Sequence, residues 1–177
     1  MKKILLQAFA IVTLLATASC EKDTEGIKDV NTPRTSSVPA ELVGRWAIVG
    51  ISGSTVYDIP AGSTHNTNEY FLGYQINADG TTKEDGYISV YQYGVTTWTR
   101  WTAYGSVQIE GGRIAFHRAH GGYTSSRNSS TTKFGPSETY PNKTASFEEF
   151  EIGRNSRGEL ALFLLDADGD VHTYVKQ

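Results

Sequence analysis

Short apolar runs alternate with pairs of turn-forming residues along most of the chain, and this rhythm limits the folds that it can adopt. Asp79-Gly80, Gly111-Gly112 and Asp168-Gly169 each stand between two apolar runs. Tight β-hairpins need residues that tolerate a positive φ at such positions. From residue 41 onward no stretch shows the periodicity of an amphipathic helix. The sequence therefore predicts an all-β domain of consecutive antiparallel strands.

The expected strands are short and are joined mainly by hairpins. They are residues 46–51, 70–77, 87–93, 98–109 (one long strand, or interrupted near Gly105), 113–117, 147–152, 159–165 and 171–176. About eight such strands are enough to close an antiparallel up-and-down β-barrel and leave no free edge. Two longer segments, Ser52–Asn68 and His120–Ser146, are expected to be loops. Loops of this length in a compact domain are usually functional or disordered.

The N-terminus has the order of parts that secretory targeting needs. Lys2 and Lys3 precede an apolar run, and the small residues Thr17-Ala18-Ser19 lead into Cys20, the only cysteine of the chain. The run is shorter than the roughly 20 residues that span a bilayer, so residues 1–19 are predicted to be a signal peptide. A cysteine in this place resembles the lipobox of bacterial lipoproteins, although Thr17 stands where that pattern prefers Leu. The resemblance implies lipidation of Cys20 and an outer-membrane anchor, with the protein facing the periplasm or the cell surface.

The next segment, residues 20–40, is polar, charged and proline-bearing, and is expected to be a flexible tether. Glu21, Asp23 and Glu25 resemble the acidic tract that directs some Gram-negative lipoproteins to the cell surface; solvated linker charge is the alternative. Loss of Lys2 and Lys3 with the leader changes the net charge from −3 to −5. A mildly acidic domain is a poor candidate for binding nucleic acid. Residues 41–177 remain as one domain.

The start of that domain resembles a known family. Leu42-Val43-Gly44-Arg45-Trp46 is similar to the Gly-x-Trp opening of lipocalins and other calycins. The leader, the tether and the final Tyr174-Val175-Lys176 are similar to lipocalin-like lipoproteins of Gram-negative anaerobic bacteria. The resemblance implies a lipocalin-like barrel with Gly44 and Trp46 as a structural motif at its closed end. A basic side chain, Lys176 or Arg100, would then cover the Trp46 ring and add about 0.5–2 kcal/mol.

Alternating tyrosines are the first candidates for a ligand site. Tyr87, Ser89, Tyr91 and Tyr93 share one face of an expected strand. If that face lines the barrel, Tyr91 and Tyr93 would form a site for an apolar or amphipathic ligand together with the residues Tyr74 and Trp101. Cross-strand aromatic packing is the alternative interpretation.

A second candidate lies on the next strand. Trp98, Arg100 and Tyr104 share the parity opposite to Trp101 and would face outward together. Such a row is typical of an anchor for a glycan or a protein partner. It is equally typical of an arginine stacked on aromatic rings.

No catalytic residue, metal site or cofactor is predicted. His117 and His120 should point apart in a strand. The acidic run Asp166–Asp170 lacks the glycine and glutamate positions of a calcium loop and stands where a hairpin is expected. Ser130–Lys133 has the spacing S-x-x-K, but the motifs that accompany it in penicillin-recognising enzymes are absent.

These features predict an envelope-anchored, non-enzymatic lipoprotein that buries a small apolar or amphipathic ligand among barrel-lining aromatic residues, gated by Ser52–Asn68. The alternative is a surface interaction module for glycans or proteins, enzyme inhibition included, with a filled barrel. A cavity lined by Tyr91, Tyr93 and Trp101 would favour the first. A packed interior with Trp98 exposed would favour the second.

Overall fold

The structure is a computed structural model that describes residues 30–58 and 63–177. The predicted signal peptide, Cys20 and the first part of the tether lie outside the described residues. Ten strands form one antiparallel sheet. They are β1 (Gly44–Asp58), β2 (Ser63–Ile76), β3 (Thr81–Gln92), β4 (Val95–Glu110), β5 (Arg113–Ser125), β6 (Asn128–Lys133), β7 (Thr144–Phe147), β8 (Glu149–Arg154), β9 (Leu160–Leu165) and β10 (Val171–Lys176), with a short 3-10 helix η1 (Pro136–Glu138) before β7.

The strands follow an up-and-down order, and the sheet curls on itself at one end. Hydrogen-bonded neighbours run β6-β5-β4-β3-β2-β1-β10-β9-β8, and β7 pairs with β5. Only Glu148 separates β7 from β8, so the chain itself crosses the gap between β5 and β9. The ladder is not closed, because β8 does not pair with β5 along this path. The predicted all-β, antiparallel up-and-down architecture is confirmed, with ten strands and an open ladder.

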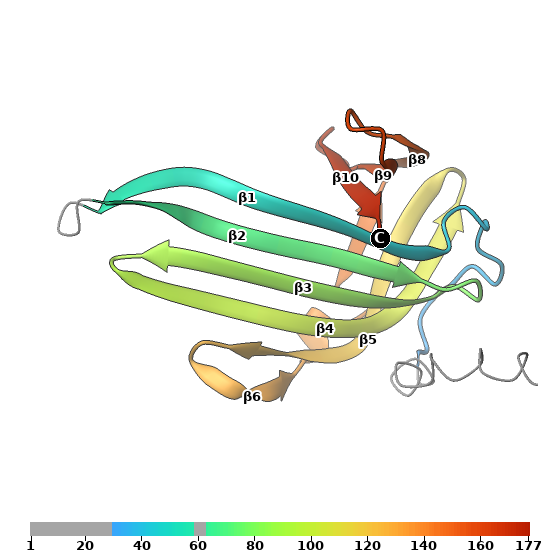
Figure 1. Cartoon of the computed structure of the whole chain (residues 1–177). Coiled ribbons are helices and arrows are strands. Elements are labelled where there is room, and N and C mark those ends of the chain that lie inside the picture. Colours follow the sequence, from blue (N-terminus) through green and yellow to red (C-terminus); the bar gives the residue numbers. More distant parts are fainter. Residues whose placement is uncertain (1–29, 59–62) are drawn as a thin grey trace, which may run out of the picture.

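Beyond the curled end, β1–β6 continue as an extended sheet (Figure 1). β10 pairs with β1 only at Trp46 and Ala47, so β8–β10 do not accompany this extension. We call it the wing: residues 49–58, 63–71, 87–100 and 122–133. It contains much of the two segments that were expected to be loops. Ser52–Asn68 lies mostly in the β1–β2 hairpin, and His120–Ser146 supplies the end of β5, all of β6, η1 and the start of β7. Strand formation in Ser52–Asn68 also removes the predicted gating loop.

The core lies inside the curled end, and inward-facing residues that alternate along the strands supply most of it. Leu162 and Leu164 of β9 are fully buried, whereas Phe163 between them is only half-buried on the other face. The rest of the core comes from every part of the curl: Val38, Leu42, Trp46, Tyr74, Ile76, Val107, Ile114, Phe116, Phe147 and Tyr174. One continuous apolar cluster therefore connects β1, β2, β4, β5, β7, β9 and β10.

Trp46 closes the base of this core. Its ring is completely buried, and its Nε1 donates a hydrogen bond of 2.8 Å to the carbonyl oxygen of Leu42. The ammonium group of Lys176 lies 5.0 Å from the ring centroid. Of the two cations that the sequence left open, Lys176 covers the ring, because Trp46 and Lys176 are direct register partners across β1 and β10. Arg100 is exposed in the wing.

The last part of the predicted tether belongs to the domain. The amide of Thr35 donates to the carbonyl of Val107 at 2.9 Å, and the Ile109 amide donates to Thr35 Oγ1 at 2.7 Å. Ser106 Oγ donates to the carbonyl of Pro33 at 2.6 Å. Gly80 permits this approach, since a Cβ there would lie 2.1 Å from the Thr35 carbonyl oxygen. The domain thus begins near residue 32 instead of the predicted residue 41.

Replacing Trp46 tests the role of this base. Trp46→Ala should lower the free energy of unfolding by about 3–5 kcal/mol, because it removes a large buried ring and leaves a cavity. Trp98→Ala is the matched control, since its ring is only half-buried and lies in the wing. Urea denaturation followed by circular dichroism measures both. Equal losses in the two variants would contradict a special role for Trp46.

Candidate functional site

The four predicted ligand residues do not line one space. Tyr74 is buried in the core, stacked on Phe116 with ring centroids 4.1 Å apart. Tyr93 is not part of a strand: it occupies the β3–β4 turn with φ 52° and is 94% exposed. Tyr91 and Trp101 lie on opposite faces, because Trp101 is the register partner of Gly86 and Tyr91 that of Thr96.

The alternating tyrosine face of β3 also points away from the core. Tyr87 is the register partner of Phe71, whereas the core residue Tyr74 is the partner of Glu84. Since side chains of a strand alternate, Tyr87 and Tyr74 are on opposite sides of the sheet. The expectation that Tyr91 and Tyr93 line a barrel is therefore wrong. The alternation along β3 did not show which face is inside, because tyrosines lie on one face and the apolar residues Ile88 and Val90 on the other.

The inward side of β3 instead holds a charged group that sequence reasoning missed. Glu84 Oε1 accepts hydrogen bonds of 2.6 Å from Trp101 Nε1 and from Arg118 Nη2. The Glu84 and Arg118 side chains are only 14% and 15% exposed. The Arg118 guanidinium lies 4.8 Å from the Phe134 ring centroid. This node joins β3, β4, β5 and the segment after β6.

The polar groups of this node are not all satisfied, and its charge affects a neighbouring phenol. Arg118 Nε is buried without a hydrogen-bond partner. Burial raises the pKa of the nearby Tyr74 phenol, and the Glu84 carboxylate raises it further, so the phenol stays protonated. No sequence signal singles out Glu84, because it stands in the polar run Lys83-Glu84-Asp85 and only the register shows that it faces inward.

The space around this node is small. A void of about 10 Å³ is lined by Tyr74, Thr82, Glu84, Ala103, Tyr104, Gly105, Phe116, His117 and Arg118. This is about the volume that one water molecule requires. Small-molecule sites are typically about 300–1,000 Å³, so the void is no ligand chamber.

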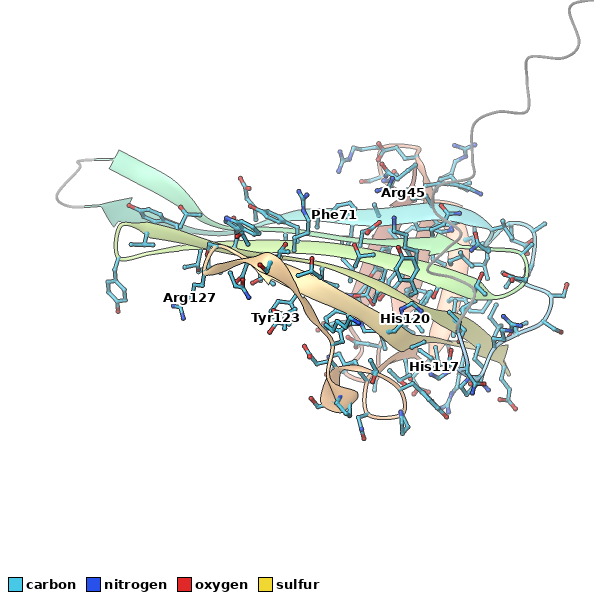
Figure 2. All side chains as sticks on the ribbon, turned by 90° about the horizontal axis from the view of Figure 1, so that it is seen from below. Arg45, Phe71, His117, His120, Tyr123 and Arg127 are labelled. Atoms are coloured by element: carbon cyan, nitrogen blue, oxygen red, sulfur yellow. The ribbon has the colours of Figure 1, made fainter. Side chains whose placement is uncertain are left out.

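The predicted outward row does share a face. Trp98, Arg100 and Tyr104 alternate on β4 opposite Trp101, and Tyr87 is the register partner of both Phe71 and Arg100. Figure 2 shows Phe71 and Tyr123 on opposite faces of the sheet, as their register requires. Arg100 is exposed, and the rings of Phe71, Tyr87 and Trp98 are half-buried. The outer face of the wing thus carries three aromatic rings around an exposed guanidinium.

The two neighbouring histidines share this outer side, contrary to expectation. A register shift in β5 makes Ser106 the partner of His117 and Tyr104 the partner of His120. Ala119 is the extra residue of this bulge, since Tyr104 pairs with His120 and Gly105 with Arg118. His117 and His120 therefore lie on the same side of β5 (Figure 2). Gly105 permits the bulge, since a Cβ there would lie 1.8 Å from the His117 carbonyl oxygen.

His117 has a structural environment. Its ring nitrogens contact Gln108 Oε1 at 3.0 Å and Thr144 Oγ1 at 3.2 Å, and its ring packs edge-on against Tyr140. Burial lowers its pKa, so the ring is held neutral. His120 packs against Tyr104 with ring centroids 5.3 Å apart. Among the described residues, no group of three or more His, Cys, Asp and Glu side chains is arranged to hold a metal ion.

The acidic run between β9 and β10 forms the expected hairpin. Asp166 Oδ1 accepts hydrogen bonds from the amides of Asp168 and Asp170 at 3.0 and 2.9 Å. Asp166 Oδ2 contacts His172 Nε2 at 2.8 Å, and this hydrogen bond lowers the pKa of the carboxyl group. The carboxylate is therefore engaged by its own turn.

Two larger cavities open on the surface of the curled end. One, of about 460 Å³, is lined by Glu149, Phe150, Glu151, Gly153, Arg154, Phe163, Leu165 and Val171. The other, of about 490 Å³, is lined by Gln108, Glu110, Gly111, Arg113, Ile114, Ala115, Ser146, Phe147 and Glu148. Across the second, Arg113 forms an exposed ion pair with Glu148. Neither is lined by a predicted ligand-binding or surface-interaction residue.

The Glu84–Arg118 pair has a testable energetic consequence. Arg118→Met leaves the Glu84 carboxylate buried without its cation and should lower the free energy of unfolding by about 3–5 kcal/mol. Glu84→Gln combined with Arg118→Met should cost less than the sum of the single changes, because the two groups interact directly. A double-mutant cycle in urea measures the difference. Strict additivity would show that the pair contributes no coupling.

Within the described residues no helix is long and apolar enough to cross a membrane. Comparison with known proteins gives no match: no protein-family model fits the chain, and no curated protein resembles it in sequence.

Proposed function

We propose that this protein is an envelope-anchored, non-catalytic binding module that recognises a glycan or a protein partner with the outer face of the wing. The observation that carries the proposal is the contrast between the two parts of the sheet. The curled end is packed, and the void at its inner polar node has a volume of only about 10 Å³. The wing, by contrast, extends beyond the curled end (Figure 1), and its outer face carries the half-buried rings of Phe71, Tyr87 and Trp98 around the exposed Arg100.

The chemistry of that face suits recognition. Trp, Tyr and Arg are the residue types enriched at binding hot spots, because they combine a large contact area with a polar group. Arg100 is flanked on its own strand by Trp98 and across the ladder by Tyr87. The rings can stack on the apolar faces of sugars or on partner side chains, while the guanidinium pairs with a carboxylate or a phosphate.

A small apolar ligand is less well supported. The predicted lining residues Tyr91 and Trp101 face opposite sides, and Tyr93 lies in a turn. None of the three cavities described above includes any of these residues. The lipocalin resemblance therefore supports the proposal through Trp46 and Lys176, which form its structural base, and not through an internal chamber.

The position of the first domain contact limits how far the domain can lie from a lipid anchor at Cys20. Thr32 Oγ1 hydrogen-bonds Ser106 Oγ at 2.6 Å, so eleven residues separate lipidated Cys20 from the first described contact of the domain. A random coil of eleven residues would span about 18 Å on average. Trp98 lies eight residues along β4 from Ser106, or about 26 Å. In this arrangement the wing extends away from the point of attachment.

The anchor is tested by replacing the lipidated residue. Cys20→Ala should move the protein from the detergent phase to the aqueous phase in Triton X-114 partitioning of cell envelopes, because no acyl chain would be attached. The unchanged protein is the control. A variant that still partitions into detergent would contradict lipidation at Cys20.

The binding face is tested with a glycan array and with photo-crosslinking from position 96 in intact cells. Trp98→Ala combined with Arg100→Ala should reduce the affinity for the recognised partner at least about tenfold, the usual effect of losing a hot spot. Arg157→Ala, an exposed arginine in the β8–β9 turn, is the matched control. Native mass spectrometry of the gently purified protein tests the alternative that the protein carries a small apolar ligand. A co-purifying apolar small molecule, with binding of all partners unaffected by the wing variant, would overturn the proposal in favour of a carrier.

A further inference from the structure

β8 ends the sheet, and its edge away from β9 has no strand partner, although its first residues lie next to the start of β5. Among the described strands it pairs with β9 alone. A free edge presents unpaired backbone N–H and C=O groups that an extended segment of another protein can use. The opposite end strand, β6, has the sequence Asn-Ser-Ser-Thr-Thr-Lys and offers only polar side chains. β8 differs because it alternates acidic and apolar residues.

An apolar groove lies beside this edge. It is the cavity of about 460 Å³ described above, formed on the outer side of β8, β9 and β10. Phe163 and Leu165 form its floor, and Val171, which is 60% exposed, stands at one wall. Gly153 leaves room for the Phe163 ring, since a Cβ there would lie 3.4 Å from Phe163 Cε2. The volume is within the usual range for binding sites of about 300–1,000 Å³.

The other wall of the groove is negatively charged. Glu149 and Glu151 are exposed, and their register partners on β9 are the floor residues Leu165 and Phe163. Neither carboxylate is in an ion pair in the described part of the chain. The nearby cation Arg154 donates to the carbonyl of Gly158 at 2.6 Å, within its own turn. The groove therefore combines an apolar floor with two unneutralised carboxylates.

The inner side of β8 is apolar. Phe150 and Ile152 alternate with the two glutamates and pack against the core cluster from a half-buried position. A strand placed next to β8 would set every second side chain beside Glu149 and Glu151, and the remaining side chains beside Phe150 and Ile152. Opposite charges on neighbouring strands attract, so the outer positions favour Lys or Arg.

We propose that β8 is a docking edge for an extended peptide segment of a partner protein in which basic and apolar residues alternate. The segment adds to the sheet by backbone hydrogen bonds; its basic side chains pair with Glu149 and Glu151, and its apolar side chains contact Phe150 and Ile152. The groove over Phe163 and Leu165 accommodates the long stems of the basic side chains. This site is separate from the outer face of the wing and does not rest on the function proposed above.

The probe is a fluorescein-labelled peptide with the sequence Lys-Val repeated four times, titrated with the protein and followed by fluorescence anisotropy at low ionic strength. The expected result is saturable binding that weakens as salt is added, because the contacts with the carboxylates are exposed. Two peptides of the same length are the matched controls. One has the sequence Lys-Lys-Lys-Lys-Val-Val-Val-Val, and the other is Glu-Val repeated four times. Both should bind at least about tenfold more weakly, since one loses the alternation and the other reverses the charge.

The site is assigned by variants and by NMR. Glu149→Lys combined with Glu151→Lys should reduce the affinity at least about tenfold, whereas Glu159→Lys, an exposed glutamate outside the groove, should leave it unchanged. Circular dichroism verifies that each variant remains folded. In the unchanged protein, binding should slow amide hydrogen exchange in β8 and not in β6, the readout that separates strand addition from charge attraction alone.

Three outcomes would overturn the proposal. One is the absence of binding by the alternating peptide at millimolar concentration. Another is equal binding by the block peptide or by the charge-reversed variant. The third is self-association, measured by analytical ultracentrifugation, that the double charge reversal abolishes, since the occupant of the edge would then be a second copy of the chain. Loss of partner binding in the variant that combines Trp98→Ala with Arg100→Ala tests only the function proposed for the wing.

Discussion

The buried Trp46 is the contact on which the rest of the structure depends. Its ring fills the base of the curl, its Nε1 ties Leu42 to the start of β1, and Lys176 at the end of β10 covers its face. β10 pairs with β1 only at Trp46 and Ala47, so the first and last strands are joined next to this ring. The cost of ordering the chain ends is therefore offset mainly by apolar burial at one point.

Concentrating the core at one end explains why the sheet has two different parts. The aromatic and aliphatic residues from β1, β2, β4, β5, β7, β9 and β10 form one buried cluster inside the curl, and the void beside Glu84 and Arg118 has a volume of only about 10 Å³. β8–β10 leave β1 after two register pairs, so the wing has no second layer from those strands. A filled interior and an uncovered sheet favour recognition at surfaces over enclosure of a ligand. At the other end of the ladder β8 pairs with β9 alone among the described strands and is therefore an end strand.

Much of the fold followed from local patterns. The glycine turns between apolar runs predicted the hairpins β2–β3, β4–β5 and β9–β10, and the irregularity near Gly105 is the observed bulge. The wing segments 52–58, 63–68 and 122–133 were not predicted as strands, because their sequences are mostly polar and show no alternation of apolar and polar residues. The end of β3 was also predicted imprecisely. The alternating pattern extended the expected strand through Tyr93, but β3 ends at Gln92, and Tyr93 and Gly94 form the turn with positive φ angles.

The register of β1 and β10 selected Lys176 over Arg100 as the cation that covers Trp46. The sequence by itself determined the all-β class, the main turns, and the row that Trp98, Arg100 and Tyr104 form on one face. Those features depend on local conformational preference and on parity within a single strand. Only the tertiary structure decided which face of β3 is inside, that Glu84 and Arg118 meet there, that His117 and His120 share a side, and that Thr32–Val38 belongs to the domain. Each of these depends on the register between strands or on contacts between distant segments, and such long-range pairings leave no periodic signal in the chain.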